Sequence, residues 1–103
     1  MSGVSYPYRY QYETVAASQT AQVLGGTGAV GDYLHSVIIS NVTAASASVT
    51  LLDGSTSIVI QTGAATLPLG IFSINLNMAS ASGAWKVTTG AGATVIGVGI
   101  FSA

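Results

Sequence analysis

The segment whose spacing matches a chemical motif is GTGAVG at residues 26–31, and the run YLHSVIISNV follows it at residues 33–42. The spacing G-x-G-x-x-G is that of a turn that binds the pyrophosphate of a dinucleotide. It does so only where a helix begins directly after the glycines, so that the helix N-terminus faces the phosphates. Residues 33–42 are rich in β-branched residues and predict a strand with both faces covered. We therefore interpret the glycines as a turn and predict no cofactor.

The side chains that could perform acid–base or nucleophilic chemistry are few. The charged residues and the single histidine are Arg9, Glu13, Asp32, His35, Asp53 and Lys86. Asp32 and His35 are close in sequence, but residues three apart on a strand face opposite sides, and no serine lies in a G-x-S-x-G turn. The carboxylates and the histidine also lack the spacing of zinc or calcium ligands. We predict no catalytic and no metal-binding residues, and a protein that is not an enzyme.

The composition limits the partners of the chain. Only 5% of the 103 residues are charged, whereas 50% are hydrophobic; an ordinary domain has about 25% charged residues. Two basic residues neutralise too few phosphates for nucleic acid to be expected as a partner. No uncharged stretch is apolar for long enough to form a membrane helix, and the first residues lack the regions of a signal peptide. We therefore expect no membrane partner either.

Alternation of apolar and polar residues predicts about eight short strands and no helix. The strands are expected at residues 8–13, 19–24, 33–42, 47–52, 57–61, 71–78, 84–88 and 94–101. Residues 1–7 are expected to form an extended N-terminal arm, and residues 8–103 a single domain. The number and spacing of the strands predict an all-β fold, a jelly-roll-like antiparallel β-sandwich.

Local patterns add detail to this fold. Asp53-Gly54 between two alternating runs predicts a hairpin turn. Gly97 and Gly99 share a face of the last strand, which predicts close packing there. The residues expected to face inward on residues 71–78 and 84–88 are Phe72, Ile74, Leu76, Met78, Trp85 and Val87.

Four tyrosines recur at every second residue near the N-terminus. In an extended chain, such residues lie on one face. Two interpretations remain open: rings in the core with their hydroxyl groups at the surface, or a surface that contacts a partner, where Tyr and Arg are enriched. The candidate contact residues are Tyr6, Tyr8, Arg9, Tyr10 and Tyr12.

The shortage of charge predicts association. Soluble monomers usually keep apart through interspersed charges and protect the edges of their sheets with Lys, Pro or inward-pointing charges. This chain has almost none of these features. We expect its faces and edges to be covered by copies of itself or by a larger assembly, as in a structural protein.

Three segments resemble parts of small virion proteins of tailed bacteriophages, notably head decoration or cement proteins. They are DGSTSI at residues 53–58, LPLGIFSINL at residues 67–76 and GAWKVTTGAG at residues 83–92, so the resemblance covers roughly the C-terminal half. It implies a β-sandwich that forms a homotrimer, is made in the cytoplasm of the host bacterium, and sits on the outer surface of the capsid. There it joins neighbouring subunits of the major capsid protein. Residues 1–32 match nothing in that family.

A second function remains open. Jelly rolls also serve as lectins, so a receptor- or carbohydrate-binding module of a phage fibre or adhesin is the alternative. That function predicts aromatic residues and Asn or Asp on loops, whereas the aromatic residues here fall mainly in expected strands.

Overall fold

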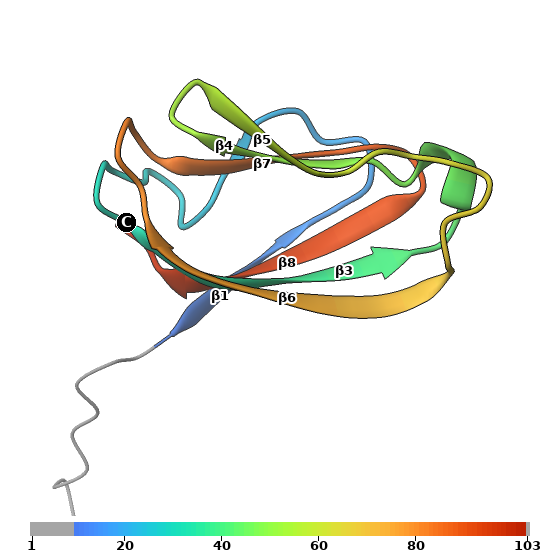
Figure 1. Cartoon of the computed structure of the whole chain (residues 1–103). Coiled ribbons are helices and arrows are strands. Elements are labelled where there is room, and N and C mark those ends of the chain that lie inside the picture. Colours follow the sequence, from blue (N-terminus) through green and yellow to red (C-terminus); the bar gives the residue numbers. More distant parts are fainter. Residues whose placement is uncertain (1–9, 103) are drawn as a thin grey trace, which may run out of the picture.

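Eight strands and one short 3-10 helix make up the computed structural model, which describes residues 10–102 (Figure 1). In chain order the elements are β1 (Gln11–Val15), β2 (Gln22–Val23), β3 (Tyr33–Asn41), η1 (Ala44–Ser46), β4 (Val49–Asp53), β5 (Thr56–Gln61), β6 (Gly70–Ala79), β7 (Trp85–Thr89) and β8 (Ala93–Ile100). The arm predicted for residues 1–7 lies outside the described residues. Nothing helical within residues 10–102 is long and apolar enough to span a membrane.

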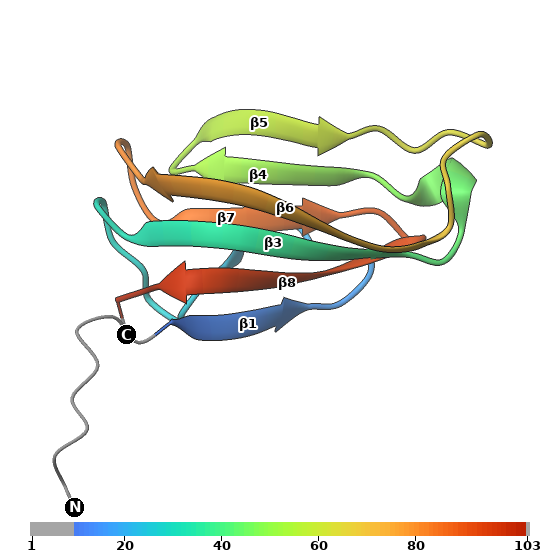
Figure 2. The same ribbon diagram turned by 60° about the horizontal axis from the view of Figure 1, so that its bottom comes forward.

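The strands form two four-stranded sheets that face each other (Figures 1 and 2). Sheet A has the order β1-β8-β3-β6 and sheet B the order β2-β7-β4-β5, and every neighbouring pair is antiparallel. Most connections therefore cross from one sheet to the other, and only β4 and β5 form a hairpin within one sheet. This is the arrangement of a jelly roll, and the predicted all-β sandwich is confirmed.

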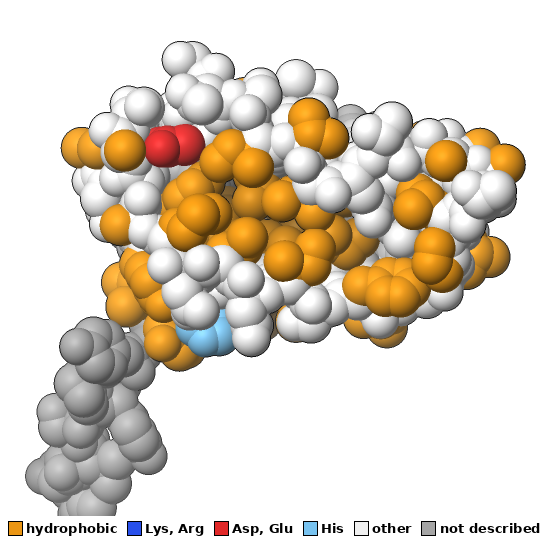
Figure 3. All heavy atoms as spheres, viewed as in Figure 1, with side chains coloured by type: hydrophobic (Ala, Val, Ile, Leu, Met, Phe, Trp, Pro, Cys, Tyr) orange, Lys and Arg blue, Asp and Glu red, His pale blue; other side chains and the backbone are white. Residues whose placement is uncertain are grey.

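The core fills the space between the sheets, because side chains alternate between the inner and outer face along each strand. Trp85 and Val87 point inward as predicted and are 2% and 0% exposed. The indole N–H of Trp85 donates a hydrogen bond to the main-chain oxygen of Asp32 at 2.9 Å, so the ring brings no unpaired polar group into the core. On the side of the molecule shown in Figure 3, apolar side chains are visible between the sheets.

The close packing predicted at Gly97 and Gly99 is confirmed. A β-carbon on Gly97 would lie 2.8 Å from Cδ1 of Leu24, which is fully buried, and one on Gly99 would meet the main-chain oxygen of Tyr33. Leu24 can pack directly on β8 because Gly97 has no side chain. This contact closes the sandwich on the side of β1 and β2.

The hairpin predicted at Asp53-Gly54 joins β4 to β5, and Gly54 has a φ of +63°, which favours glycine. The carboxylate of Asp53 also accepts hydrogen bonds from the main-chain N–H groups of Ala81 (3.0 Å) and Ser82 (2.9 Å). These bonds, with Ser82 making the larger contribution, hold the pKa of Asp53 below its ordinary value. Asp53 therefore fixes the β6–β7 loop on the β4–β5 hairpin, a role beyond the predicted one.

Two strand predictions need correction. The second strand is only two residues long instead of six, because Ala21 has a φ of +49° and its N–H bonds the side-chain hydroxyl group of Thr88. β3 has one covered face instead of two. Its inner residues, such as Val37, are buried, whereas Ile38 on the outer face is half-exposed. The reason is that no other element of residues 10–102 packs on the outer face of sheet A.

Candidate partner-contact surface

Three tyrosines and the histidine gather on the outer face of sheet A. We call Tyr10, Tyr12, Tyr33 and His35 the aromatic surface. The ring centroids of Tyr10 and His35 are 4.6 Å apart, those of Tyr10 and Tyr33 are 6.3 Å apart, and those of Tyr33 and His35 are 6.4 Å apart. At these separations aromatic rings attract one another. Tyr12 follows Tyr10 by two residues and so lies on the same face of the chain.

The order of the strands explains why residues distant in sequence meet here. β8 lies between β1 and β3. Tyr33 on β3 is opposite Ile100, and Gln11 on β1 is opposite Gly99. Because β1 and β8 are antiparallel, Tyr10 also lies beside Ile100. The rings of Tyr10 and Tyr33 therefore approach each other across β8.

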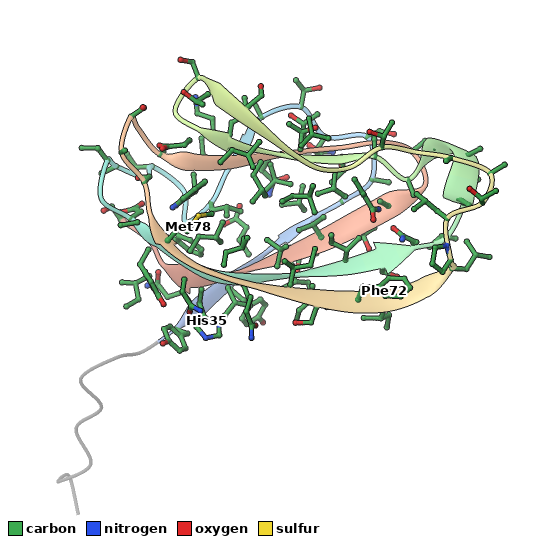
Figure 4. The ribbon with its side chains drawn as sticks, in the orientation of Figure 1. His35, Phe72 and Met78 are labelled. Carbon is green, nitrogen blue, oxygen red and sulfur yellow. The ribbon has the colours of Figure 1, made fainter. Side chains whose placement is uncertain are left out.

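Two hydrogen bonds hold the β3 part of the aromatic surface. The hydroxyl group of Tyr33 donates to Oδ1 of Asn77 on β6 at 2.8 Å. Nδ1 of His35 lies 3.0 Å from the hydroxyl oxygen of Ser36, within hydrogen-bonding distance. On β8, the neighbouring residues Gly99 and Val98 lie opposite Leu34 and Ser36, so His35 is the extra residue of a bulge in the β3–β8 pair. Figure 4 shows His35 on the outer side of sheet A, pointing away from sheet B.

Exposure rules out the core interpretation for the tyrosines of the N-terminal run that the structure describes. Tyr12 is 74% exposed and Tyr10 is 49% exposed, so neither ring belongs to the core. The other three candidate contact residues, Tyr6, Tyr8 and Arg9, lie outside the described residues. The aromatic surface thus contains two of the five predicted contact residues.

Tyr33 and His35 belong to the aromatic surface although the sequence did not point to them as contact residues. Their spacing of two residues places both on one face of a strand. That spacing was visible in the sequence, but the position of β3 one strand away from β1 was not.

The surroundings of the aromatic surface are uncharged. In the part of the chain that the structure describes, the outer face of sheet A carries no Asp, Glu, Lys or Arg; its half-exposed residues include Ile38, Ile96, Val98 and Ile100. Glu13 of β1 is turned to the other side, where its Oε1 accepts a hydrogen bond from the N–H of Gly25 at 3.1 Å. A partner can therefore cover this face without burying a charge.

The remaining carboxylates also hold main-chain groups in place. Asp32 is 6% exposed, and its Oδ2 accepts hydrogen bonds from the N–H groups of Ala29 and Ser102, both at 3.0 Å. Asp53 holds the β6–β7 loop in the same way. Within residues 10–102, no three His, Asp or Glu side chains come together as ligands of a metal ion would. The geometry of these groups suits the fixing of loops.

The glycine loop at residues 26–31 is closed by the protein itself. A strand, β3, follows it, as predicted. The N–H of Gly28 donates to the main-chain oxygen of Ser102 at 2.9 Å, and the N–H of Gly31 donates to that of Ser80 at 3.0 Å. N–H groups that hold a phosphate point at the ligand, whereas these are already bonded. The loop thus ties the C-terminal residues to the sandwich.

Comparisons with protein families, curated proteins and solved structures found no match to this chain. Its function is therefore proposed from its sequence, its fold and its surface chemistry.

Proposed function

We propose that the chain is a capsid decoration protein, or cement protein, of a tailed bacteriophage. As a homotrimer it binds the outer surface of the head, where it joins neighbouring subunits of the major capsid protein and stabilises the joints between them. It is a structural protein of the virion and not an enzyme, and it is made in the cytoplasm of the host bacterium. The resemblance of residues 53–58, 67–76 and 83–92 to such proteins supports this assignment.

The observation that carries the proposal is the exposed aromatic surface on a face without Asp, Glu, Lys or Arg among the described residues. Tyrosine offers a large contact area and a polar tip at a small cost in side-chain entropy. The packing of Tyr10, Tyr33 and His35 against one another restricts these rings before any partner binds. The surrounding face has no Asp, Glu, Lys or Arg among the described residues. Contact with the capsid shell therefore removes water from this face without burying an unpaired charge.

The residues just before the aromatic surface extend the proposed contact. Tyr6, Tyr8 and Arg9 precede Tyr10 directly, and Tyr and Arg are the residue types that dominate binding energy at interfaces. We call these three residues together with the aromatic surface the foot. A specific contact buries about 800 Å² on each partner, and the foot is one part of such an area.

In a trimer, feet that each bind weakly can together hold the protein on the capsid. Once one foot of a trimer is bound, the other two bind at an effective concentration set by the short span between them. The trimer therefore holds several capsid subunits together more tightly than any single foot does. Bridging of this kind stabilises the joints between capsomers without any chemical step.

Co-sedimentation with head shells tests the proposal. Purified full-length protein is mixed with the bare and mature head shells of the phage that carries its gene, and its mass in solution is measured by light scattering. We expect a trimer that sediments with shells and saturates at a fixed ratio to the major capsid protein. Protein that remains in the supernatant with both kinds of shell would remove the proposal.

One observation favours the alternative, a receptor- or carbohydrate-binding module. Asn77 accepts the hydrogen bond from the hydroxyl group of Tyr33, and Asn75 is exposed on the same strand. Amide groups beside aromatic rings are also the means by which proteins bind sugars. A glycan array distinguishes the two functions: selective binding of one class of sugar, together with no binding to shells, would favour the alternative.

A further inference from the structure

The core of the sandwich is off-centre. Of the described hydrophobic residues, thirteen are buried, and none of them comes from β5, β6 or the loop between them. Six more hydrophobic residues pack against the core but stay partly exposed, and all six come from that part of the chain: Ile58, Ile60, Leu67, Ile74, Leu76 and Met78. We call these six residues the open side, in contrast to the side that Leu24 closes.

Both strands of the open side lie at the edge of their sheets. Within residues 10–102, β5 pairs only with β4, and β6 pairs only with β3. Figure 3 looks onto this side and shows apolar side chains gathered in a hollow between the two sheets. In Figure 4 the side chain of Met78 lies between the sheets, on the opposite side of sheet A from His35.

The sequence of β6 is that of a strand with a covered inner face. Ile74, Leu76 and Met78 occupy every second position and face inward as predicted, and Asn75 faces the other way. Phe72, which was expected on the same inner face, is 38% exposed. Alternation of this kind is typical of a strand that packs on a core. Here it leaves a contiguous apolar patch, and such patches mark interaction sites.

The absence of charge favours a second copy of the chain as the partner. Residues 54–85 contain no Asp, Glu, Lys, Arg or His. The free edge of β6 also has neither Pro nor charge, the features that normally keep an edge strand from pairing with another chain. An ordinary protein surface carries many charged groups, which would lose water against the open side without gaining a partner. A second copy brings surfaces as poor in charge as its own.

The gap between the two sheets supplies part of the area of a specific contact. β6 has ten residues, and at ~3.3 Å per residue its edge is ~33 Å long. The two sheets lie ~10 Å apart, so the gap between their edges covers about 330 Å². A specific interface buries about 800 Å² per partner, so the edges of β5 and β6 and the side chains around the gap must supply the rest of the contact.

We propose that the open side is where a second copy of this chain binds. This inference rests on the proposed function, in which the chain forms a homotrimer. It identifies the surface through which the chains of one trimer contact each other. In a closed ring of three, each copy uses two different surfaces for its two neighbours. The open side is one of those surfaces, and contact there completes the burial of Ile74, Leu76 and Met78.

Two single-cysteine variants test this proposal, since the chain has no cysteine of its own. Leu76→Cys places a thiol on the open side, and the matched control Asn75→Cys places one on the outer face of the same strand. The rate of reaction with a water-soluble thiol reagent is measured at concentrations where light scattering shows oligomer and monomer. We expect Leu76→Cys to react at least about tenfold more slowly in the oligomer, by mass action, and Asn75→Cys to react equally fast in both.

Three results would overturn the proposal. One is equal reaction of Leu76→Cys in oligomer and monomer, and another is a protein that stays monomeric at every concentration. The third is protection of Leu76→Cys that appears only when head shells are added, since the capsid would then be the occupant. Protection in a trimer that ignores head shells would instead support the self-interface and remove the proposed function, so the two failures are distinguishable.

Discussion

Replacing Tyr12 by alanine is the sharpest test of the foot. Tyr12 is the most exposed of the described aromatic residues, with 74% of the residue surface in solvent. Exposed side chains of this kind contribute little to stability, so we expect the free energy of unfolding to change by no more than about 0.5 kcal/mol. Any loss of binding by Tyr12→Ala therefore reports on the contact itself.

The size of the loss follows from the area of the ring. A tyrosine buries 150–250 Å² when it is fully covered. The exposed 74% of Tyr12 then corresponds to about 110–190 Å², or about 3–5 kcal/mol at 25 cal/mol per Å². Ordering the side chain costs about 1 kcal/mol. At least about 2 kcal/mol remains for each foot, which is about a 30-fold change in Kd.

Shell occupancy measures this loss. Wild type and Tyr12→Ala are titrated against a fixed amount of head shells, and the bound fraction is measured after sedimentation. Because the proposed trimer has three feet, the concentration needed for half occupancy should rise by more than the single-foot factor. Val59→Ala is the matched control, because Val59 is 64% exposed but lies on β5 of the other sheet.

The reasoning is refuted if Tyr12→Ala fills the shells at the wild-type concentration while its mass and circular dichroism are unchanged. An equal loss in Val59→Ala whose mass in solution is that of the wild type would also refute it, because the loss would then follow from exposure in general and not from the aromatic surface.

Three further substitutions test how the sandwich is held together. Gly97→Ala should lower the free energy of unfolding by about 1–3 kcal/mol, because its methyl group overlaps Leu24. Urea unfolding followed by the fluorescence of Trp85 measures this, and Leu24→Val in the same chain should restore part of the loss; an unchanged midpoint would contradict the overlap. The pKa of Asp53 is lowered from 3.8 in the folded chain, so its carboxylate stabilises the fold at neutral pH and that stability is lost as the pH falls through the folded value. The melting temperature of wild type should accordingly approach that of Asp53→Asn on acidification, and a constant difference down to about pH 2 would be inconsistent with this. Thr89→Val removes a side chain that is 5% exposed and bonds two main-chain groups of the β1–β2 loop. The expected loss is about 1–3 kcal/mol by urea unfolding, whereas Thr89→Ser should lose less, and equal losses would argue against the hydroxyl group as the cause.

The elements that the sequence predicted well are those decided by neighbouring residues. Asp53-Gly54 determines a hairpin because the turn needs a residue that accepts a positive φ. The alternation of Ile74, Leu76 and Met78 assigns the inner face of β6 because successive side chains of a strand point to opposite sides. Neither prediction required knowledge of which strands pair.

The candidate site depended on information that local patterns do not contain. Tyr10 and Tyr33 meet only because β8 pairs with both β1 and β3, and alternation does not say which strands are neighbours. The open side could not be predicted from the sequence either, because strands with covered and uncovered inner faces show the same alternation of apolar and polar residues. β2 is short because the N–H groups of Gln19 and Ala21 donate to the side-chain hydroxyl groups of Thr89 and Thr88 instead of to main-chain oxygens.

The position of β8 between β1 and β3 determines when sheet A can finish forming during folding. Among residues 10–102, β1 pairs only with β8, and β8 is the last of the described strands. During synthesis on the ribosome, β1 emerges first and waits unpaired until nearly the whole domain has been made. When β8 inserts between β1 and β3, it brings Tyr10 to Tyr33 in the same event. A nascent chain that has not yet formed β8 therefore has no assembled aromatic surface, and any contact that needs this surface must wait until the domain has folded.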